Sequence, residues 1–463
     1  MTKKSDLASE YEHILNVDKK CFDEACKFTE GYKIFMNSSK TERECVNTII
    51  EIVKSKAYKE FNSSVKELKA GEKFFVNNRG KALVLITIGK ETLDKGVNFV
   101  ISHIDSPRLD LKPNPMYESE GISYFKTHYY GGIRKYQWPT IPLSMHGRIF
   151  KADGSFVDIC IGEKEDETKF IITDLLPHLA DEQNKRTLRE GIKGEELNIV
   201  IGSIPIDDED TEIKETIKEK TLRILNEMYG IKEKDFARAE IEFVPAYKAS
   251  DIGFDKSLIA AYGQDDKVCA YPALMAEIEN VNPEKTSISV FTDKEEIGSE
   301  GNTGMVSEYL FDIMEDLADI ANVKARDIYK NSICLSSDVN SAYDPTFADA
   351  FEKRNASHIN HGVVLTKYTG HAGKSGSNDA SAETMAKVIK LMDDKKVVWQ
   401  IGELGKVDIG GGGTIAKYVS QRNIDTIDVG VAVLSMHSPY ELTSKLDIYH
   451  TYLAYKAFLC NAS

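Results

Sequence analysis

The sequence lacks the features that mark membrane-spanning and secreted proteins. No stretch of 18 apolar residues occurs in its 463 residues, and its N-terminus has no apolar core of a signal peptide. The seven cysteines are scattered, odd in number and without CxxC spacing. This usage is typical of a reducing compartment and argues against cysteine zinc ligands. We therefore expect a cytoplasmic protein with no membrane partner.

An excess of positive charge is also absent. Lys and Arg number 59 against 74 Asp and Glu, which gives a formal net charge of −15. Because binding a phosphate backbone requires a basic face that releases counterions, this charge argues against a nucleic-acid partner. We interpret the charge as a source of solubility. Internal repeats and low-complexity segments are absent as well.

Neither of the two glycine-rich segments is a phosphate-binding loop. The first contains Gly373, Lys374 and Ser375, but the position five residues before Gly373 is Tyr368, where such a loop requires glycine. The second, at 410–413, has no lysine after it at the required spacing. The sequence therefore excludes a nucleotide-binding loop of this type.

The chain has enough apolar residues for a large core, and their pattern differs between two parts of the sequence. The chain is 41% hydrophobic and exceeds the usual single-core limit of roughly 250 to 300 residues. Residues 1–110 begin with helical periodicity and continue into two strand-like runs, and residues 251–463 alternate helix with strand, as in a parallel-rich α/β sheet. Residues 111–250 are aromatic-rich, broken by Pro and Gly, and carry short strand-like runs, so we expect an inserted domain there.

Metal-ligand side chains stand at or just past the ends of five apolar runs. They are His103 with Asp105, Asp265 with Asp266, Glu295 with Glu296, Asp338, and His437. In a mostly parallel α/β sheet, groups at the carboxyl ends of strands converge on one crevice. Imidazole and carboxylate groups are zinc ligands, and two ions held close together form a hydrolytic centre. The pattern predicts a two-metal hydrolase.

Each of these groups also has a structural interpretation when taken alone. His103 and Asp105 suit a metal ligand with a carboxylate that steers it, or a satisfied histidine before a turn. Glu295 and Glu296 would repel each other without a cation, yet they also suit a solvated turn. In an extended segment their side chains point to opposite sides, so one can bind metal while the other faces the substrate water.

The remaining candidates are similarly ambiguous as single residues. Asp265 and Asp266 precede an apolar helix, so a bridging role for Asp265 and a helix-capping role for Asp266 can hold together. Asp338 and His437 suit a turn aspartate and a core histidine. Only their combination favours the metal site.

The order His-x-Asp, Asp, Glu-Glu, Asp, His resembles the co-catalytic zinc exopeptidases. The segments HIDSPRLDLKPNP, FTDKEEIGSEGNTG, LSSDVNSAYDP and DVGVAVLSMHSPYE are similar to the M18 aminopeptidases over nearly the whole chain. The resemblance implies a three-layer α/β/α catalytic domain and two Zn²⁺ per subunit, with Mn²⁺ or Co²⁺ as possible substitutes. It implies that His103, Asp265 and Asp338 hold one zinc, that Asp265, Glu296 and His437 hold the other, that Glu295 is the general base and that Asp105 orients His103.

The resemblance also implies an assembly. The insertion would be a dimerisation domain, and dimers would build a tetrahedral dodecamer that admits peptides. Family members carry a histidine in the insertion that reaches a neighbour's active site, and only His178 in PHLADEQ is left here to serve that role. Lys374 aligns with the substrate pocket, as the cation for an acidic first residue or as a plain loop lysine. The segment 410–413 would bring its backbone close to the substrate.

Three functions compete on this evidence. The first is a zinc aminopeptidase that removes N-terminal residues, expected to be acidic, from peptides, with Glu295 deprotonating the attacking water. The second keeps the fold and acts as an amidohydrolase or deacylase on small N-acyl amino acids. The third is a non-enzymatic shell with structural metals. The presence of Glu295 beside the full ligand set argues against the third.

Overall fold

The chain folds into two units, each with its own sheet. The computed structural model describes residues 10–207 and 212–461. Contacts assign Met1–Asp105, Ala249–Met436 and Glu441–Ser463 to the first unit, and Ser106–Lys248 with His437–Tyr440 to the second. The second unit is thus an insertion in the first, together with a short return of the chain. The sequence-based boundaries of the insertion were 111 and 250.

A nine-stranded sheet forms the centre of the first unit. Its order is β1 (Lys59–Glu60), β2 (Lys73–Asn78), β3 (Ala82–Thr87), β14 (Ser287–Thr292), β4 (Asn98–His103), β15 (Ile333–Ser336), β19 (Asp425–Gly430), β17 (Val363–Thr366) and β18 (Trp399–Ile401). The four consecutive strands β14, β4, β15 and β19 run parallel. Their carboxyl ends therefore meet at one edge of the sheet, where such folds build their sites.

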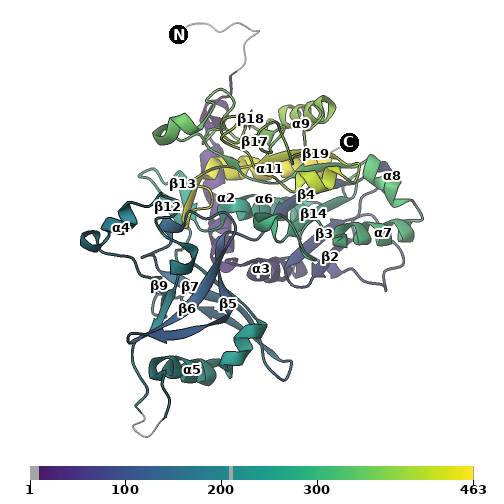
Figure 1. Ribbon diagram of the computed structural model, residues 1–463. Helices are drawn as coiled ribbons and strands as arrows, with labels where there is room; N and C mark the ends of the chain where they lie inside the picture. Colours follow the sequence, from purple (N-terminus) through teal and green to yellow (C-terminus); the bar gives the residue numbers. More distant parts are fainter. Residues whose placement is uncertain (1–9, 208–211, 462–463) are drawn as a thin grey trace. The chain divides into compact units, whose positions relative to one another are not determined.

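Helices cover both faces of this sheet. One face packs against α2 (Cys21–Ser38), α3 (Glu42–Lys54), α6 (Gln264–Glu279), α9 (Ala382–Asp394) and α11 (Lys445–Asn461). The other packs against α7 (Tyr309–Ala321), α8 (Ala325–Lys330) and α10 (Ala416–Ser420). Helices α6 and α11 lie side by side (Figure 1). This arrangement confirms the predicted three-layer α/β/α fold class.

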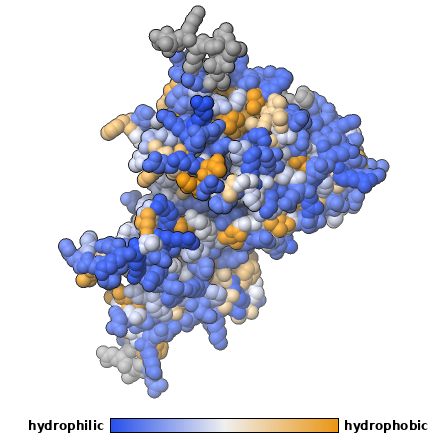
Figure 2. Space-filling view, turned by 45° about the horizontal axis from the view of Figure 1, so that its top comes forward, coloured by the Kyte–Doolittle hydropathy of each residue, from blue (hydrophilic) through white to orange (hydrophobic). Residues whose placement is uncertain are grey.

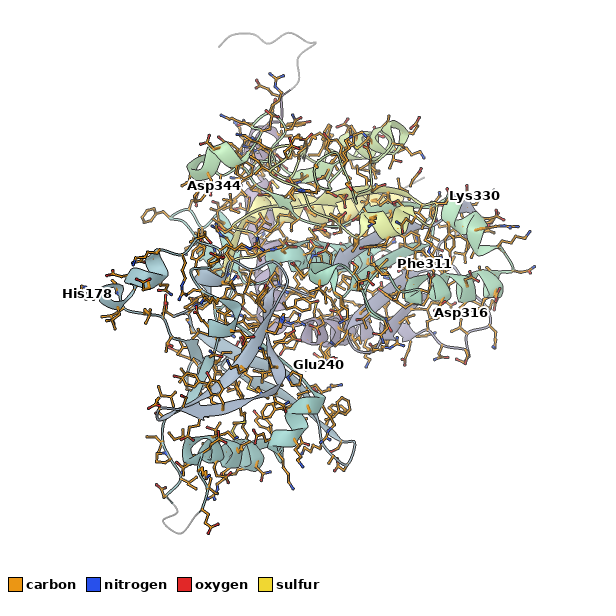
Figure 3. The ribbon with its side chains drawn as sticks, viewed as in Figure 1. His178, Glu240, Phe311, Asp316, Lys330 and Asp344 are labelled. Atoms are coloured by element: carbon orange, nitrogen blue, oxygen red, sulfur yellow. The ribbon has the colours of Figure 1, made fainter. Side chains whose placement is uncertain are left out.

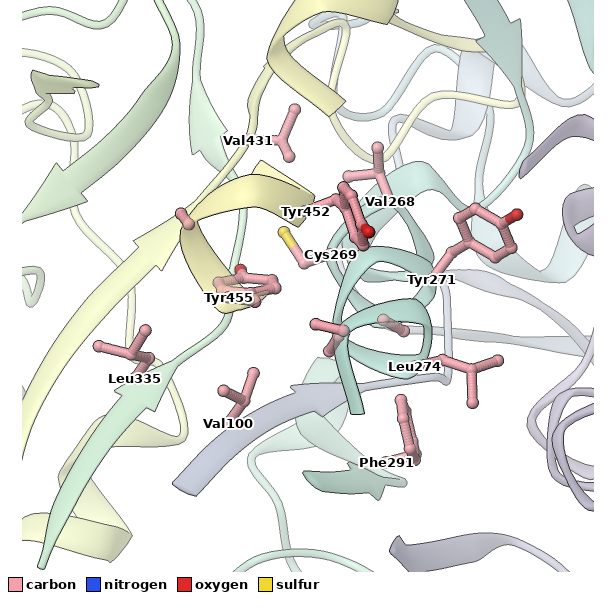
Figure 4. Packing of buried hydrophobic residues seen from close by; sticks show 14 of the residues in the cluster. Val100, Val268, Cys269, Tyr271, Leu274, Phe291, Leu335, Val431, Tyr452 and Tyr455 are labelled. Atoms are coloured by element: carbon pink, nitrogen blue, oxygen red, sulfur yellow. The ribbon is translucent and has the colours of Figure 1, made fainter. Parts of the chain in front are cut away.

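The alternation of side chains along β4 explains why its central residues, 99–101, are all apolar. Phe99 and Ile101 belong to the core beneath α7, whereas Val100 belongs to the core beneath α6. A strand covered on both faces needs apolar residues at every position rather than at alternate ones. Figure 4 shows Val100 and Leu335 from the sheet in the same core as Cys269 and Leu274 of α6.

A smaller five-stranded sheet completes the first unit. Its order is β12 (Ser250–Ile252), β13 (Leu258–Ala261), β21 (Glu441–Ser444), β20 (Ala432–Leu434) and β16 (Asn340–Ser341). Strand β13 leads directly into α6, and it pairs with β21 so that Ala261 lies opposite Glu441. The start of α6 is thereby placed beside the strand that follows His437 in the sequence.

The second unit is an antiparallel sheet with short helices. The order of its strands is β8 (Phe156–Ile161), β7 (Leu143–Phe150), β11 (Ala239–Pro245), β5 (Arg108–Ser119), β6 (Ile122–Tyr130), β10 (Ile199–Gly202) and β9 (Ile171–Ile172). The charge-dense segment before residue 230 contains a largely solvated helix, α5 (Thr216–Tyr229). Trp138 is fully buried within the unit.

The visible surface is mainly hydrophilic, with isolated hydrophobic residues (Figure 2). Among the residues that the structure describes, no helix has the length and apolarity required to cross a bilayer.

Candidate metal centre

His103 is the last residue of β4 and lies among carboxylates. Its side chain is 1% exposed. Its Nδ1 lies 3.1 Å from the backbone oxygen and 3.3 Å from Oδ1 of Asp105, and its Nε2 lies 3.1 Å from Oδ1 of Asp265. Oε2 of Glu295 is 3.9 Å from the same Nε2. With its proton on Nδ1, donated to Asp105, the imidazole presents the Nε2 lone pair to a metal ion.

Asp105 also contacts the loop that carries the two adjacent glutamates. Its Oδ1 accepts the backbone N–H of Glu295 and its Oδ2 accepts that of Glu296, both at 3.2 Å. The carboxylate is completely buried. A single side chain thus holds the end of β4 against the loop after β14.

Asp265 and Asp266 stand at a break in the first turn of α6. Their backbone angles are non-helical, and regular helix begins only after Asp266. Asp266 therefore stands where a capping residue would, but neither of its carboxylate oxygens accepts a backbone hydrogen bond. The expected capping role of its side chain is wrong, because the carboxylate points into the metal centre instead.

Two overlapping sets of ligand atoms converge here. In each set the atoms lie within 4.8 Å of one another: His103 with Asp265 and Glu296, and His103 with Asp266 and Asp338. Four of the five predicted ligands are therefore close together, with Glu295 beside them. Asp266 is a further candidate ligand, which the sequence had suggested as a cap of α6. Its position next to a predicted ligand was the only available signal.

The charges of the cluster favour a bound metal cation. Burial raises the pKa of Asp266 and Asp338 well above the usual range, and neighbouring carboxylates raise both further. Burial lowers the pKa of His103, but its hydrogen bonds with Asp105 and Asp265 outweigh this and hold it well above its ordinary value. A dry cluster of this kind retains protons unless divalent cations neutralise it. The imidazole and carboxylate donors are those that zinc accepts.

Comparison with known proteins decides the family. Residues 35–459 match the aminopeptidase I zinc metalloproteases (M18). The chain belongs to the M18 aminopeptidase family. A probable M18 family aminopeptidase 1 of Clostridium acetobutylicum is 46% identical over 465 residues, which cover 99% of this chain and 100% of that protein. The resemblance inferred from the motifs is confirmed, and the chain is a metalloaminopeptidase, a hydrolase of the zinc-dependent class.

Solved structures agree with this assignment. Crystal structures of an M18 aminopeptidase from Thermotoga maritima and of aminopeptidase I from Clostridium acetobutylicum are each 43% identical to the chain, with a TM-score of 0.93. Both alignments cover 98% of this chain, with 99% of the first structure and 100% of the second.

His437, the fifth predicted ligand of this M18 chain, is grouped with the second unit and contacts a backbone oxygen there. Its Nδ1 lies 3.1 Å from the backbone oxygen of Gly132. His437 follows directly after Met436, the last residue of the segment that contains β20. Its role as a zinc ligand remains a prediction.

Lys374 of this M18 chain is engaged by neighbours on its own loop. Its Nζ lies 3.0 Å from Oδ2 of Asp379 and 3.8 Å from the ring centroid of Tyr368. The loop follows β17, which is antiparallel to β19, so it leaves the sheet at the edge opposite to the carboxyl ends of β4 and β15. Asn378 fixes it there by donating to the backbone oxygen of Thr426 at 2.6 Å.

The two glycine-rich segments pack against each other. Gly370 donates its backbone N–H to Gly412 at 2.6 Å. Gly411 has a φ of +127°, and a Cβ there would lie 1.9 Å from the oxygen of Gly370. Only glycine allows this approach. His178, the remaining candidate, is exposed on the segment that includes α4 (Asp181–Asn184) in the second unit (Figure 3).

Proposed function

We propose that this chain uses two zinc ions to remove acidic N-terminal residues from peptides. The observation that carries the proposal is the convergence of His103, Asp265, Glu296 and Asp338 on the site, with Glu295 at its border. Oδ1 of Asp265 lies 3.1 Å from Nε2 of His103, so one ion could contact both side chains. His437 would supply the fifth ligand. Mn²⁺ and Co²⁺ are possible substitutes for zinc.

The residues of the chain divide the chemical work. When bound, a pair of zinc ions polarises the scissile carbonyl and makes water acidic enough to attack near neutral pH. Glu295 accepts the proton of the attacking water, because its carboxylate faces the cluster while its neighbour Glu296 belongs to a ligand set. Asp105 holds the proton of His103 on Nδ1 and fixes the backbone of both glutamates.

The acidic preference rests on Lys374, whose ammonium group would pair with the side-chain carboxylate of the substrate. Because its loop starts at the edge of the sheet opposite to the metal centre, this pairing requires the loop to reach across to the bound peptide. In the structure this ammonium group pairs with Asp379. The side chain of Lys374 is 43% exposed, so a substrate could reach it. A substrate carboxylate would take the place of Asp379, much as one anion replaces another at an exposed lysine.

A substrate panel tests the reaction class. Metal-stripped enzyme is assayed on chromogenic aminoacyl substrates after zinc, manganese or cobalt is restored. We expect release of free amino acids from unblocked substrates and none from N-acyl amino acids. Release from N-acyl amino acids would favour the deacylase instead. A preference for apolar residues would remove the acidic specificity and leave the two-metal aminopeptidase.

The assembly that we propose is a tetrahedral dodecamer built from dimers, in which the second unit forms the dimer contact. Large apolar side chains of this unit are exposed on the segment next to His178: Leu175, Leu176, Leu179 and Leu188. A cluster of this kind is costly to leave in water. A yeast aminopeptidase 1 with the same fold and 24% identity is described as a dodecamer. We propose that His178 reaches the active site of a neighbouring copy.

We also propose that the protein works in the cytoplasm. All seven cysteines are free in the structure, and four of them are buried. Thiols kept free in this number are typical of a reducing compartment. Fractionation of cells that express the protein, with a cytoplasmic and a membrane marker, would test this location.

A further inference from the structure

We infer that Glu441 is a positioning residue for Asp265, and that it sets the affinity of the metal centre without touching a metal ion. This inference rests on the proposed role of Asp265 as a ligand. Glu441 is the first residue of β21, and it comes four residues after His437 in the sequence. Its side chain is 1% exposed.

The contacts of Glu441 centre on one oxygen. Oε2 accepts the backbone N–H of Gln264 at 2.5 Å and that of Asp265 at 3.2 Å. Both amides come before the regular part of α6, which begins after Asp266, so no preceding turn of helix offers them a partner. The preceding residue, Gly263, has no side chain that could cap them. A glutamate from another strand therefore provides the cap.

A second set of hydrogen bonds holds the same pair together. The side-chain amide of Gln264 donates to the backbone oxygen of Glu441 at 2.6 Å, and its Oε1 accepts from the hydroxyl of Tyr32 at 3.1 Å. Tyr32 is fully buried in α2. The peptide that leads into Asp265 is thus held by β21 on one side and α2 on the other. It has little freedom to move the carboxylate.

A buried lysine offsets the charge of this arrangement. Lys267 is 1% exposed and lies with its Nζ 5.6 Å from the ring centroid of Tyr262. Burial lowers the pKa of Lys267, while the charges of Glu441 and Asp105 act in the opposite direction. One cation thus lies near both carboxylates that hold the ligand-bearing loops.

The consequence concerns geometry at the metal. A carboxylate that bridges two ions must keep both oxygens in place, and groups that orient metal ligands typically contribute 10- to 100-fold to metal affinity. The cap by Glu441 keeps the non-helical backbone of Asp265, with φ −77° and ψ 108°, in register with His103. Without the cap, the first turn of α6 would be free to move away from the end of β4.

Two substitutions of Glu441 distinguish the effect of side-chain length from that of charge. Glu441→Gln keeps an oxygen that can accept both N–H groups but loses the charge, whereas Glu441→Asp keeps the charge but is one methylene too short. The full-length chain is titrated with zinc against a competing chelator, and bound zinc is counted by mass spectrometry. We expect Glu441→Gln to stay within about 3-fold of the wild-type zinc affinity and Glu441→Asp to lose about 10- to 100-fold.

The matched control is Glu277, another buried glutamate, which lies in α6. It accepts hydrogen bonds from the hydroxyls of Thr87, Ser287 and Ser289 at 2.6, 3.0 and 3.1 Å. Glu277→Asp should lower thermal stability and leave the zinc affinity unchanged. On the restored enzyme, Glu441→Asp should lower kcat more than it raises KM, because a displaced Asp265 disturbs the metal centre while the contacts to the substrate side chain remain.

The possible results separate the inference from the proposed function. If Glu441→Gln loses as much zinc as Glu441→Asp, charge and not hydrogen bonding is responsible, and the inference is overturned. Wild-type zinc affinity in Glu441→Asp would overturn it as well. If the wild type itself binds fewer than two zinc ions per subunit, it is the proposed two-metal function that fails.

Discussion

Asp105 accepts the backbone N–H of Glu295 at 3.2 Å with one oxygen of the carboxylate that also faces His103. The proposed ligand His103 at the end of β4 and the proposed base after β14 are therefore positioned by the same side chain. The second oxygen takes the N–H of Glu296. This arrangement explains why an acidic residue is needed two positions after His103, since only a carboxylate offers two acceptors and no donor.

Replacing Asp105 with asparagine should lower turnover. Asp105→Asn keeps one acceptor oxygen but turns an amide N–H₂ toward one of the two backbone N–H groups, so one hydrogen bond becomes a repulsion. We expect kcat to fall by about 10- to 100-fold with KM little changed. Steady-state kinetics on the zinc-loaded variant measure both parameters.

The control for this variant is Asp447, a buried aspartate that also accepts two backbone N–H groups. They come from Asn360 at 2.7 Å and Gly362 at 2.8 Å. Asp447→Asn should lose stability for the same reason as Asp105→Asn but keep its turnover. An equal fall of kcat in both variants would show that general destabilisation, and not the position of Glu295, is responsible.

Substitutions of the two adjacent glutamates, Glu295 and Glu296, should have different effects on turnover and on zinc binding. Glu295→Gln is expected to keep zinc and to lower turnover by about 10²- to 10⁴-fold, the usual contribution of a general base. Glu296→Gln is expected to lose zinc, because Glu296 belongs to a ligand set with His103 and Asp265. Zinc counting and kinetics on both variants check this. If Glu295→Gln loses zinc and Glu296→Gln keeps it, the two roles are the reverse of those proposed.

Much of the fold and site could be read from sequence because their signals are local. The apolar run before His103 forms β4, and the run before Asp338 forms β15, as expected for strands covered on both faces. Once parallel strands were inferred, the rule that sites lie at their carboxyl ends was enough to bring His103 and Asp338 together. The specific side chains then indicated zinc.

The rest depends on contacts between distant segments. Nothing local indicates that Asp105 accepts N–H groups from residues 190 positions away, or that Glu441 caps α6. The glycine that ends β19 is a further example. A Cβ on Gly430 would lie 1.8 Å from the backbone oxygen of Asp338, so this glycine permits a close approach between β19 and the segment after β15 that sequence alone does not reveal. Asp266 was misassigned for the same reason.

Stability should depend on pH through Asp428, a buried residue of β19. Burial raises its pKa from the ordinary 3.8 to about 6. Because the folded state binds this proton more tightly than the unfolded state, the protonated carboxyl of Asp428 stabilises the fold. This stabilisation is fully present below about pH 4 and is lost as pH rises through 6, which lowers the free energy of unfolding by about 3 kcal/mol. Asp428→Asn should therefore lose less stability than the wild type between pH 4 and 7. Chemical denaturation of metal-free protein measures the difference.

Asp425, three residues earlier on the same strand, provides the comparison. It is exposed and lies 3.4 Å from Nζ of Lys387. Asp425→Asn should follow the wild-type pH dependence within about 0.5 kcal/mol, as surface substitutions usually do. Identical pH dependence in wild type and Asp428→Asn would show that Asp428 does not titrate in this range.

Assembly should depend on the exposed leucines of the second unit. Leu176 and Leu179 are 50% and 66% exposed. Replacing both with glutamate would place charges in the proposed dimer contact, so we expect a smaller particle in sedimentation velocity. Val281→Glu, at a 72% exposed position of the first unit, should sediment like the wild type. A wild-type protein that is monomeric at micromolar concentration would remove both the dimer and the dodecamer.

Substrate preference should depend on Lys374. The net charge of −15 repels acidic peptides at long range, but charges beyond about 8 Å are largely screened at physiological salt, so one local cation can decide specificity. A charge-assisted hydrogen bond of roughly 1.5–3 kcal/mol corresponds to about ten- to a hundred-fold in preference. Lys374→Met should lower kcat/KM for Asp and Glu substrates by this factor and spare Leu and Met substrates.

Lys367 is the matched control for Lys374, because both lysines pair with Asp379 and have similar exposure, 39% against 43%. Lys367→Met removes a charge of the same sign from the same loop. If charge on the loop were sufficient, both variants would lose acidic substrates equally. We expect only Lys374→Met to do so, because its Nζ lies 3.8 Å from the ring centroid of Tyr368, against 5.9 Å for Nζ of Lys367, so the ring fixes the direction of Lys374 more closely. An equal loss for all substrates in Lys374→Met would show that the lysine supports the loop and not the specificity.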